Sequence, residues 1–202
     1  MSPRVRAERK IAAFARAGVL RARPMKPTFV ALDFETANHS PDSACAIGLV
    51  RVEGEQVVAQ QGSLIRPPSR HFAFTRIHGI TWDQVKTEST FAAVWPRFVA
   101  LLQGAQFIAA HNASFDRNVL SVCLQKAQLA PPRLPFVCTL QLARRVLGIF
   151  PSNLSAVAQH LAVPLQHHDA LSDAHACAQI VIAARRRSAE AHRTSVVMPL
   201  GV

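Results

Sequence analysis

Apolar and polar positions change period several times along the chain, and each change marks an expected element. Residues 28–34 (TFVALDF) form a short apolar run that predicts a strand. Two further strand-like runs at 44–52 and 56–65 flank the Glu-Gly-Glu turn at 53–55, which predicts an antiparallel hairpin. Residues 90–104 have a helical period that should stop at the terminal glycine.

In the second half of the chain, short apolar runs alternate with helical segments. We expect strands at 105–110 and 134–139, and helices at 114–129, 140–148, 152–163 and from about 169 onward, with Ser114 as a candidate cap. Three early strands followed by this alternation predict an α/β layer fold, with a mixed sheet of about five strands flanked by helices.

The length of 202 residues suits one domain with a sizeable core and short extensions. Residues 1–26 carry eight Lys or Arg against Glu8 alone, and Pro24 and Pro27 separate them from the first strand. This stretch is either a basic helical extension or a transit-like targeting segment. We therefore expect an N-terminal extension at 1–26, a domain at 27–187 and a loose tail at 188–202.

The net charge of +11 favours a polyanionic partner, because phosphates neutralised by Lys and Arg release counterions. A membrane surface is an alternative partner for such charge. Without an apolar run of roughly 18 residues, we expect no membrane span. The four cysteines form no CxxC pair, which favours reduced thiols in a cytoplasm over a disulfide framework.

Of the 12 acidic residues, five lie within otherwise apolar or weakly polar elements: Asp33, Glu35, Asp116, Asp169 and Asp173. Asp33 and Glu35 are two residues apart on a strand, so they project from the same face. Asp116 and Asp173 fall in the first turns of predicted helices, where the helix dipole alone also favours a carboxylate.

Clustered carboxylates repel one another unless a positive charge lies between them. Divalent metal ions meet that need, and Mg²⁺ prefers a few carboxylates together with substrate phosphate. Two such ions can stabilise both the attacking and the leaving oxygen of a phosphoryl displacement. In a basic protein, the cluster therefore predicts a metal-dependent phosphodiesterase that acts on nucleic acid.

Four segments in order resemble the DEDD exonucleases, in their DnaQ-like DEDDh branch on a ribonuclease H-like fold. They are DFET with Asp33 and Glu35, IHGIT at 77–81, HNASFD with Asp116, and HHDALSD with His168 and Asp173. IHGIT also resembles a segment of bacterial proofreading subunits, such as the epsilon subunit of DNA polymerase III. Four residues separate His168 from Asp173, as in the histidine branch, and the chain has no Tyr for the tyrosine branch.

The resemblance implies a two-metal site with two Mg²⁺ ions, for which Mn²⁺ can substitute. Asp33, Glu35 and Asp173 would hold one ion, Asp33 would bridge to the second, and Asp116 would assist through water. His168, rather than its neighbour His167, would take the proton from the attacking water.

Other residues of these motifs are candidate substrate contacts: Phe34, Thr36, His78, Asn112 and Phe115. His111 and Asn112 are alternatively simple caps, and Asp169 matches no ligand position and is expected at the helix N-terminus. The RHFAFTR stretch at 70–76 suits either single-strand binding or core packing.

The expected function is 3′–5′ exonuclease activity on single-stranded DNA, releasing nucleoside 5′-monophosphates for proofreading or repair, with a polymerase or repair complex as a candidate partner. An exoribonuclease similar to the RNase T or oligoribonuclease groups is the alternative, since no 2′-OH reader is identifiable. A non-catalytic nucleic-acid-binding module is disfavoured, because all five catalytic positions are intact.

Overall fold

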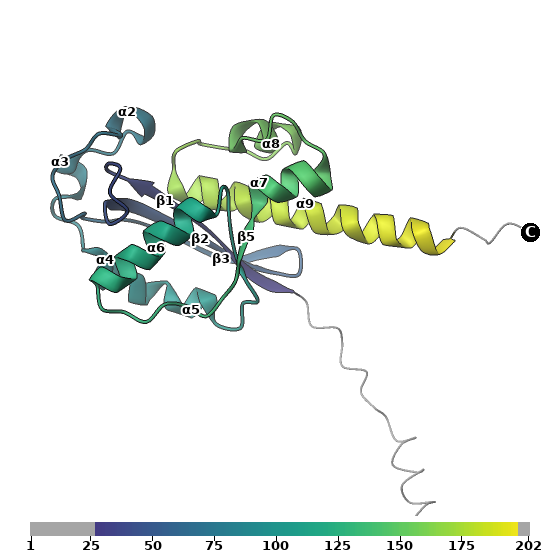
Figure 1. Ribbon diagram of the computed structural model, residues 1–202, viewed down its shortest axis with the longest axis horizontal. Helices are drawn as coiled ribbons and strands as arrows, with labels where there is room; N and C mark the ends of the chain where they lie inside the picture. The colour runs from purple at the N-terminus through teal and green to yellow at the C-terminus, as the bar shows by residue number, and fades with distance from the viewer. Residues whose placement is uncertain (1–26, 198–202) are drawn as a thin grey trace, which may run out of the picture.

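The computed structural model describes residues 27–197, which form a sheet with helices on both faces (Figure 1). The strands are β1 (Thr28–Thr36), β2 (Ala44–Glu53), β3 (Gln56–Leu64), β4 (Ile108–Ala110) and β5 (Phe136–Cys138). They lie in the order β3-β2-β1-β4-β5, with β1, β2 and β3 antiparallel in turn and β1, β4 and β5 parallel. The predicted mixed five-stranded sheet is confirmed, and β1 is its central strand.

The predicted hairpin is also confirmed. β2 and β3 pair antiparallel around a turn in which Gly54 has a φ of 70°. A residue without a Cβ adopts this left-handed conformation at little cost.

Helices cover each face of the sheet as two groups (Figure 1). One face carries α4 (Phe91–Val94), η1 (Trp95–Arg97), α5 (Val99–Leu102) and α6 (Ser114–Lys126). The other carries α7 (Thr139–Leu142), the π-helical turn η2 (Ala143–Leu147), α8 (Leu154–His160) and α9 (Ala170–Val197). The short helices α2 (Thr75–His78) and α3 (Trp82–Val85) lie near the end at which β1 finishes.

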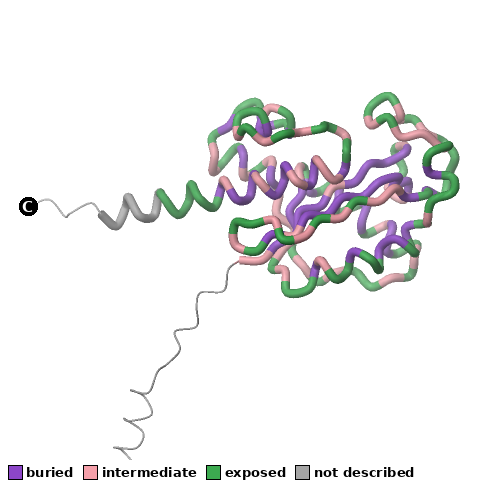
Figure 2. The backbone as a smooth tube through the Cα atoms, turned by 180° about the vertical axis from the view of Figure 1, so that it is seen from behind, coloured by how far each residue is buried: buried purple, intermediate pink, exposed green. Residues whose placement is uncertain are grey.

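The side chains of strand β1 alternate between the two hydrophobic cores. Phe29 and Ala31 pack with α8 and α9, while Val30, Leu32 and Phe34 pack with α4, η1 and α6. Strands β1, β2 and β4 therefore form the buried centre seen in Figure 2, while β3 and β5 are partly exposed. Because side chains alternate along a strand, Asp33 and Glu35 lie on the same side of β1 as Phe29 and Ala31 and face α9.

One predicted helix is interrupted. The segment 90–104 forms α4, η1 and α5 instead of a single helix. Pro96 lies at the break, and it has no N–H to donate to the preceding turn. Gly104 adopts a φ of 68° beyond α5, as its predicted role as terminator requires.

The last helix is longer than the sequence predicted. α9 begins at Ala170, close to the expected start, but continues to Val197 and so passes through the segment expected to be loose from residue 188. Ala, Arg and Glu favour a helix even without core contacts. Arg186 also pairs with Glu55 of the hairpin turn at 3.0 Å. The expected basic extension at 1–26 lies outside the described residues.

Two further expectations concern membrane-spanning helices and the cysteines. Within residues 27–197, no helix is both long and apolar enough to cross a bilayer. All four cysteines are within this range and are free thiols; Cys45, Cys123 and Cys177 are buried, and Cys138 is partly exposed.

Candidate active site

The end of β1 brings its two carboxylates to the first turns of α9. Asp33 and Glu35 project toward α9, and a carboxylate oxygen of each lies within 4.8 Å of the other and of an oxygen of Asp173. The sequence predicted that Asp33 and Glu35 share a face of β1 and that Asp173 lies in the first turns of the last helix. The fold places these three acidic groups together.

The start of α9 fixes Asp173 through local hydrogen bonds. The N–H of Ser172 donates to Asp169 Oδ1 at 2.8 Å, so Asp169 caps the helix as expected. The N–H of His168 donates to Asp173 Oδ2 at 3.2 Å. The carboxylate of Asp173 is thus oriented by the loop that carries the two histidines.

Asp116 joins the cluster from the other face of the sheet. It lies in the first turn of α6, and its Oδ1 accepts the N–H of Phe34, the residue between the two carboxylates of β1, at 3.1 Å. Its Oδ2 is buried and has no hydrogen-bond partner in the described part of the chain. A buried polar atom without a partner is costly in a folded protein, so this oxygen needs a ligand.

Burial raises the pKa of all four carboxyl groups, and repulsion by neighbouring carboxylates adds to the shift for Asp33, Glu35 and Asp116. The pKa of Asp33 rises well above its ordinary value, first through burial and then through repulsion by Asp116 and Asp173. Burial raises the pKa of Glu35 to about 8 and that of Asp116 to about 8. Burial also raises the pKa of Asp173, although His167 opposes the shift.

No Lys or Arg among residues 27–190, where side chains are described, forms an ion pair with any of these four carboxylates. A hard divalent cation binds oxygen donors and stabilises the ionised form of buried carboxyl groups. It would also give the unpaired Oδ2 of Asp116 a ligand. The residues present therefore fit a divalent metal ion, which Asp33, Glu35 and Asp173 would hold, with Asp116 beside them.

Both histidines of the HHD stretch lie at this site. Their rings stack with centroids 3.8 Å apart, and Nδ1 of His167 lies 3.1 Å from Asp173 Oδ2. His168 has a φ of 67°, and burial followed by the neighbouring His167 lowers its pKa. A lowered pKa keeps His168 neutral near pH 7, as a general base requires. The direct contact of His167 with Asp173 was not predicted.

A cleft of about 410 Å³ opens above the cluster. Eight of the ten predicted site residues line it; Asp116 and Asn112 do not. Asp116 is buried beneath. Asn112 is exposed and left-handed, with a φ of 59°, and its Oδ1 accepts a hydrogen bond from Ser114 Oγ at 3.4 Å. Ser114 is thus the first residue of α6 instead of its cap, since no side chain caps this helix.

His78 holds the cleft together while lining it. Its Nδ1 accepts the N–H of Ile80 at 3.0 Å, so its Nε2 carries the proton and donates to the carbonyl of Thr36 at 3.1 Å. Burial lowers the pKa of His78 and favours this neutral form. The imidazole therefore ties α2 to the end of β1.

His111 makes a similar link on the opposite wall. Its Nε2 donates to the carbonyl of Ser152 at 3.0 Å, and its Nδ1 lies 3.0 Å from Thr139 Oγ1. It thereby connects the start of α7 with the loop before α8 and supports the wall, instead of capping α6.

The two candidate phenylalanines differ in exposure. Phe34 is 3% exposed and packs against Phe91, with ring centroids 6.4 Å apart. Phe115 is 45% exposed at the cleft. Further apolar residues complete the walls: Phe74 and Ile77 at α2, and Leu140 and Leu154 at α7 and α8. Phe74 and Ile77 lie within the RHFAFTR and IHGIT segments that the sequence singled out, whereas nothing in the sequence pointed to Leu140 and Leu154.

The strand order and the acidic end of the central strand define the class of protein: a ribonuclease H-like fold with carboxylates able to hold divalent metal ions. Residues 30–181 match the RNase_T family, described as exonucleases. The chain belongs to this DnaQ-like 3′–5′ exonuclease family and carries its exonuclease domain.

The relatives include much larger proteins. The chain is 35% identical over 160 residues to the PolC-type DNA polymerase III of Thermotoga maritima, covering 77% of this chain and 12% of the relative. It is 33% identical over 155 residues to the 3′-5′ exonuclease DinG of Bacillus subtilis, covering 74% and 16%. The chain thus spans less than a fifth of either protein.

Among solved structures, exonuclease X in complex with 5′ overhanging duplex DNA superposes with a TM-score of 0.65 and 26% identity. The match covers 80% of this chain and 93% of that one. The fold and family predicted from the sequence are confirmed.

Proposed function

We propose that this protein is a metal-dependent 3′–5′ exonuclease that hydrolyses single-stranded DNA from its 3′ end and releases nucleoside 5′-monophosphates. The observation that carries the proposal is the cluster of Asp33, Glu35, Asp116 and Asp173 beneath a cleft that His168 also lines. The names of two similar proteins, a 3′-5′ exonuclease and an exonuclease in complex with DNA, support the same conclusion.

Each residue has a definite task in this proposal. The four carboxylates hold two Mg²⁺ ions, for which Mn²⁺ can substitute. When bound, such ions stabilise the charge on the attacking and leaving oxygens. His168 accepts the proton of the attacking water through its neutral imidazole. Phe115, Phe34, Thr36 and His78 line the space for the terminal nucleotide, which makes the exposed ring of Phe115 the residue best placed to pack against its base.

The cellular setting is part of the same proposal. We infer that the domain spans 27–187, that it works in the cytoplasm, and that it serves proofreading or repair beside a polymerase or repair complex. The similarity to a PolC-type polymerase supports a polymerase partner. RNA trimming with the same site is the alternative, because the sequence identifies no residue that reads the 2′-OH.

The test is hydrolysis of matched DNA and RNA oligomers labelled at the 5′ end, with Mg²⁺ or Mn²⁺ and with a chelator control. We expect a chelator-sensitive ladder that is much faster on DNA, and its loss in Asp33→Ala and Asp173→Ala. A ladder mainly on RNA would establish the alternative. Full activity in either variant, or binding without any ladder, would overturn the proposed site.

A further inference from the structure

The segment between β3 and the end of α3, residues 66–86, carries aromatic and cationic side chains outside the cleft; we call it the β3–α3 segment. The guanidinium carbon of Arg70 lies over the ring of Trp82, 5.5 Å from its centroid. Phe72 meets the same indole edge to face, with centroids 6.5 Å apart. The contact holds the Arg70 guanidinium over an aromatic surface, and its N–H groups have no partner among the described side chains.

The cations of this segment differ in whether they have partners. Lys86 pairs with Asp83 at 2.7 Å. Arg70 and Arg76 are exposed, and neither forms an ion pair or a hydrogen bond with any of residues 27–190, the range in which side chains are described. An arginine that is held in place and lacks a carboxylate partner is suited to bind phosphate.

The segment is continuous with the wall of the cleft. Phe74 and Ile77 line the cleft, Arg76 precedes Ile77 in α2, and Phe72 lies two residues before Phe74 in the chain. The hydrogen bond from His78 to Thr36 fixes this wall to the end of β1. Arg76 and the Arg70–Trp82 pair therefore belong to the same segment of the chain as this wall of the cleft.

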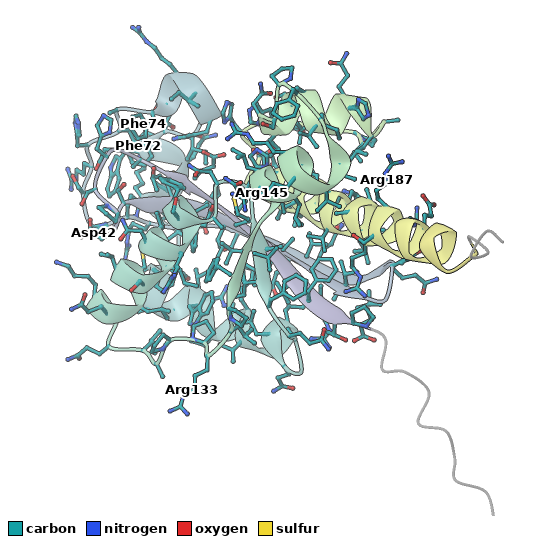
Figure 3. All side chains as sticks on the ribbon, turned by 45° about the vertical axis from the view of Figure 1, so that its right-hand side comes forward. Asp42, Phe72, Phe74, Arg133, Arg145 and Arg187 are labelled. Carbon is teal, nitrogen blue, oxygen red and sulfur yellow. The ribbon has the colours of Figure 1, made fainter. Side chains whose placement is uncertain are left out.

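The opposite wall is less suited to a polyanion. Leu140 and Leu154 present apolar groups to the cleft. Arg144 behind them is engaged, since its Nε donates to Ser152 Oγ at 2.6 Å. Arg145 is the remaining cation of that turn (Figure 3) and provides a direct comparison.

We propose that the β3–α3 segment is a second binding site for single-stranded nucleic acid, on the 5′ side of the nucleotide in the cleft. Arg70 and Arg76 bind backbone phosphates, and the Trp82–Arg70 stack packs against a base. The orientation of the strand rests on the proposed function; the binding site itself does not. Its consequence is that long single strands are preferred over substrates that fill the cleft alone.

Two assays separate this site from the chemistry. Binding of a fluorescent oligothymidylate of roughly 20 nucleotides, longer than one site requires, is followed by anisotropy in chelator, so that no hydrolysis occurs. Hydrolysis of the p-nitrophenyl ester of thymidine 5′-monophosphate with Mg²⁺ reports the cleft alone. The variants are Arg70→Ala, Arg76→Ala, their double and Trp82→Leu, with Arg133→Ala as the control at the far end of the molecule (Figure 3).

We expect the double variant to bind the oligomer roughly 10- to 100-fold more weakly, the range for lost phosphate and stacking contacts. The slope of log affinity against log salt should fall by about 0.7 for each phosphate contact removed. Ester hydrolysis should stay within about twofold of wild type, because neither arginine lines the cleft. Trp82→Leu should weaken oligomer binding and, because Arg70 loses its support, lower the salt slope by no more than Arg70→Ala does; if it does not fold, the arginine variants still decide.

Unchanged oligomer binding and salt slope in the double variant would overturn the inference, and so would an equal loss in Arg133→Ala. A larger loss in Arg145→Ala than in the double variant would place the strand on the opposite wall and also overturn it. The wild-type protein could also hydrolyse neither the labelled oligonucleotides nor the ester while the arginine variants still bind the oligomer more weakly. In that case the proposed function fails and the second site stands.

Discussion

Gly48 of β2 is the cross-strand partner of Asp33 of β1, and it faces the first turn of α9. A Cβ at Gly48 would lie 2.5 Å from the Cα of Leu171 and closer still to the carbonyl of Ala170. Since paired residues share a face of the sheet, the missing side chain opposite Asp33 is what lets α9 approach. That approach brings Asp173 to the carboxylates of β1.

Gly48→Ala should therefore damage the acidic cluster and the fold together. The atoms in the way are backbone, so the start of α9 must move, and we expect a loss of about 1–3 kcal/mol in the free energy of unfolding. Hydrolysis should fall more steeply than stability explains, because Asp173 moves with the helix. Urea denaturation and steady-state kinetics at a temperature where the variant is folded measure the two effects.

Gly62→Ala is the matched control for this change. Gly62 is the partner of Gly48 on β3, and its Cβ would lie 3.3 Å from Leu171 Cβ, 3.5 Å from Leu171 Cδ2 and 3.8 Å from the carbonyl oxygen of Ile47. Because Leu171 Cβ would have to move by only a few tenths of an ångström, far less than the backbone atoms at Gly48, both effects should be smaller than in Gly48→Ala. If the two variants behave alike, close approach at Gly48 does not position α9.

Replacing His168 and replacing His167 should change different kinetic parameters. His168→Ala should lower kcat by roughly 10²–10⁴, the usual contribution of a general base. His167→Ala should instead raise the Mg²⁺ concentration for half-maximal rate by roughly tenfold, since its Nδ1 orients Asp173 from 3.1 Å. Metal titrations of both variants measure this difference. A greater loss of kcat in His167→Ala would reverse the assignment.

The pKa shifts predict how pH changes the stability of the metal-free protein. Burial raises the pKa of Glu35 and of Asp116 to about 8, whereas both groups ionise near pH 4 when unfolded. Between these pH values the folded state holds more protons than the unfolded state, so the free energy of unfolding falls as pH rises.

The loss should amount to at least ~1.4 kcal/mol, the equivalent of one shifted pKa unit. Thermal or urea denaturation in chelator from about pH 5 to about pH 8 measures it. Saturating Mg²⁺ should flatten the slope, because the ion binds the ionised cluster. A metal-free protein that becomes more stable over this range would show that these carboxylates are not strained.

Local patterns foretold much of the fold and of the acidic cluster. The two-residue spacing of Asp33 and Glu35 placed both on one face of β1, and Glu-Gly-Glu marked the hairpin. Such signals depend on near neighbours in the chain, so they survive folding. Pro96 carried an equally local signal against one long helix, which the apolar period over 90–104 masked.

What the sequence left out depends on contacts between distant segments. Leu140 and Leu154 reach the cleft only because the α7–α8 wall packs over α9. His78, expected at the substrate, is also the tether of Thr36, 42 residues away. Likewise spacing selects His168, but only the folded loop shows that His167 touches Asp173. Pairings of this kind have no periodic signature.

Phe34 and Phe115 were both expected to contact substrate, but their replacement by Ala should affect different properties: stability for Phe34 and substrate affinity for Phe115. Phe34 is 3% exposed and packs in the core with Phe91, so Phe34→Ala should destabilise the fold by about 3–5 kcal/mol. Phe115 is 45% exposed at the cleft, so Phe115→Ala should leave the unfolding free energy nearly unchanged and raise KM for oligonucleotides by roughly tenfold, the effect of one lost stacking contact. Phe115→Leu, which keeps bulk without an aromatic face, should recover little of that KM. Denaturation and kinetics on one oligomer decide the matter, and a Phe115→Ala variant with unaltered KM would remove this ring from the proposed substrate contacts.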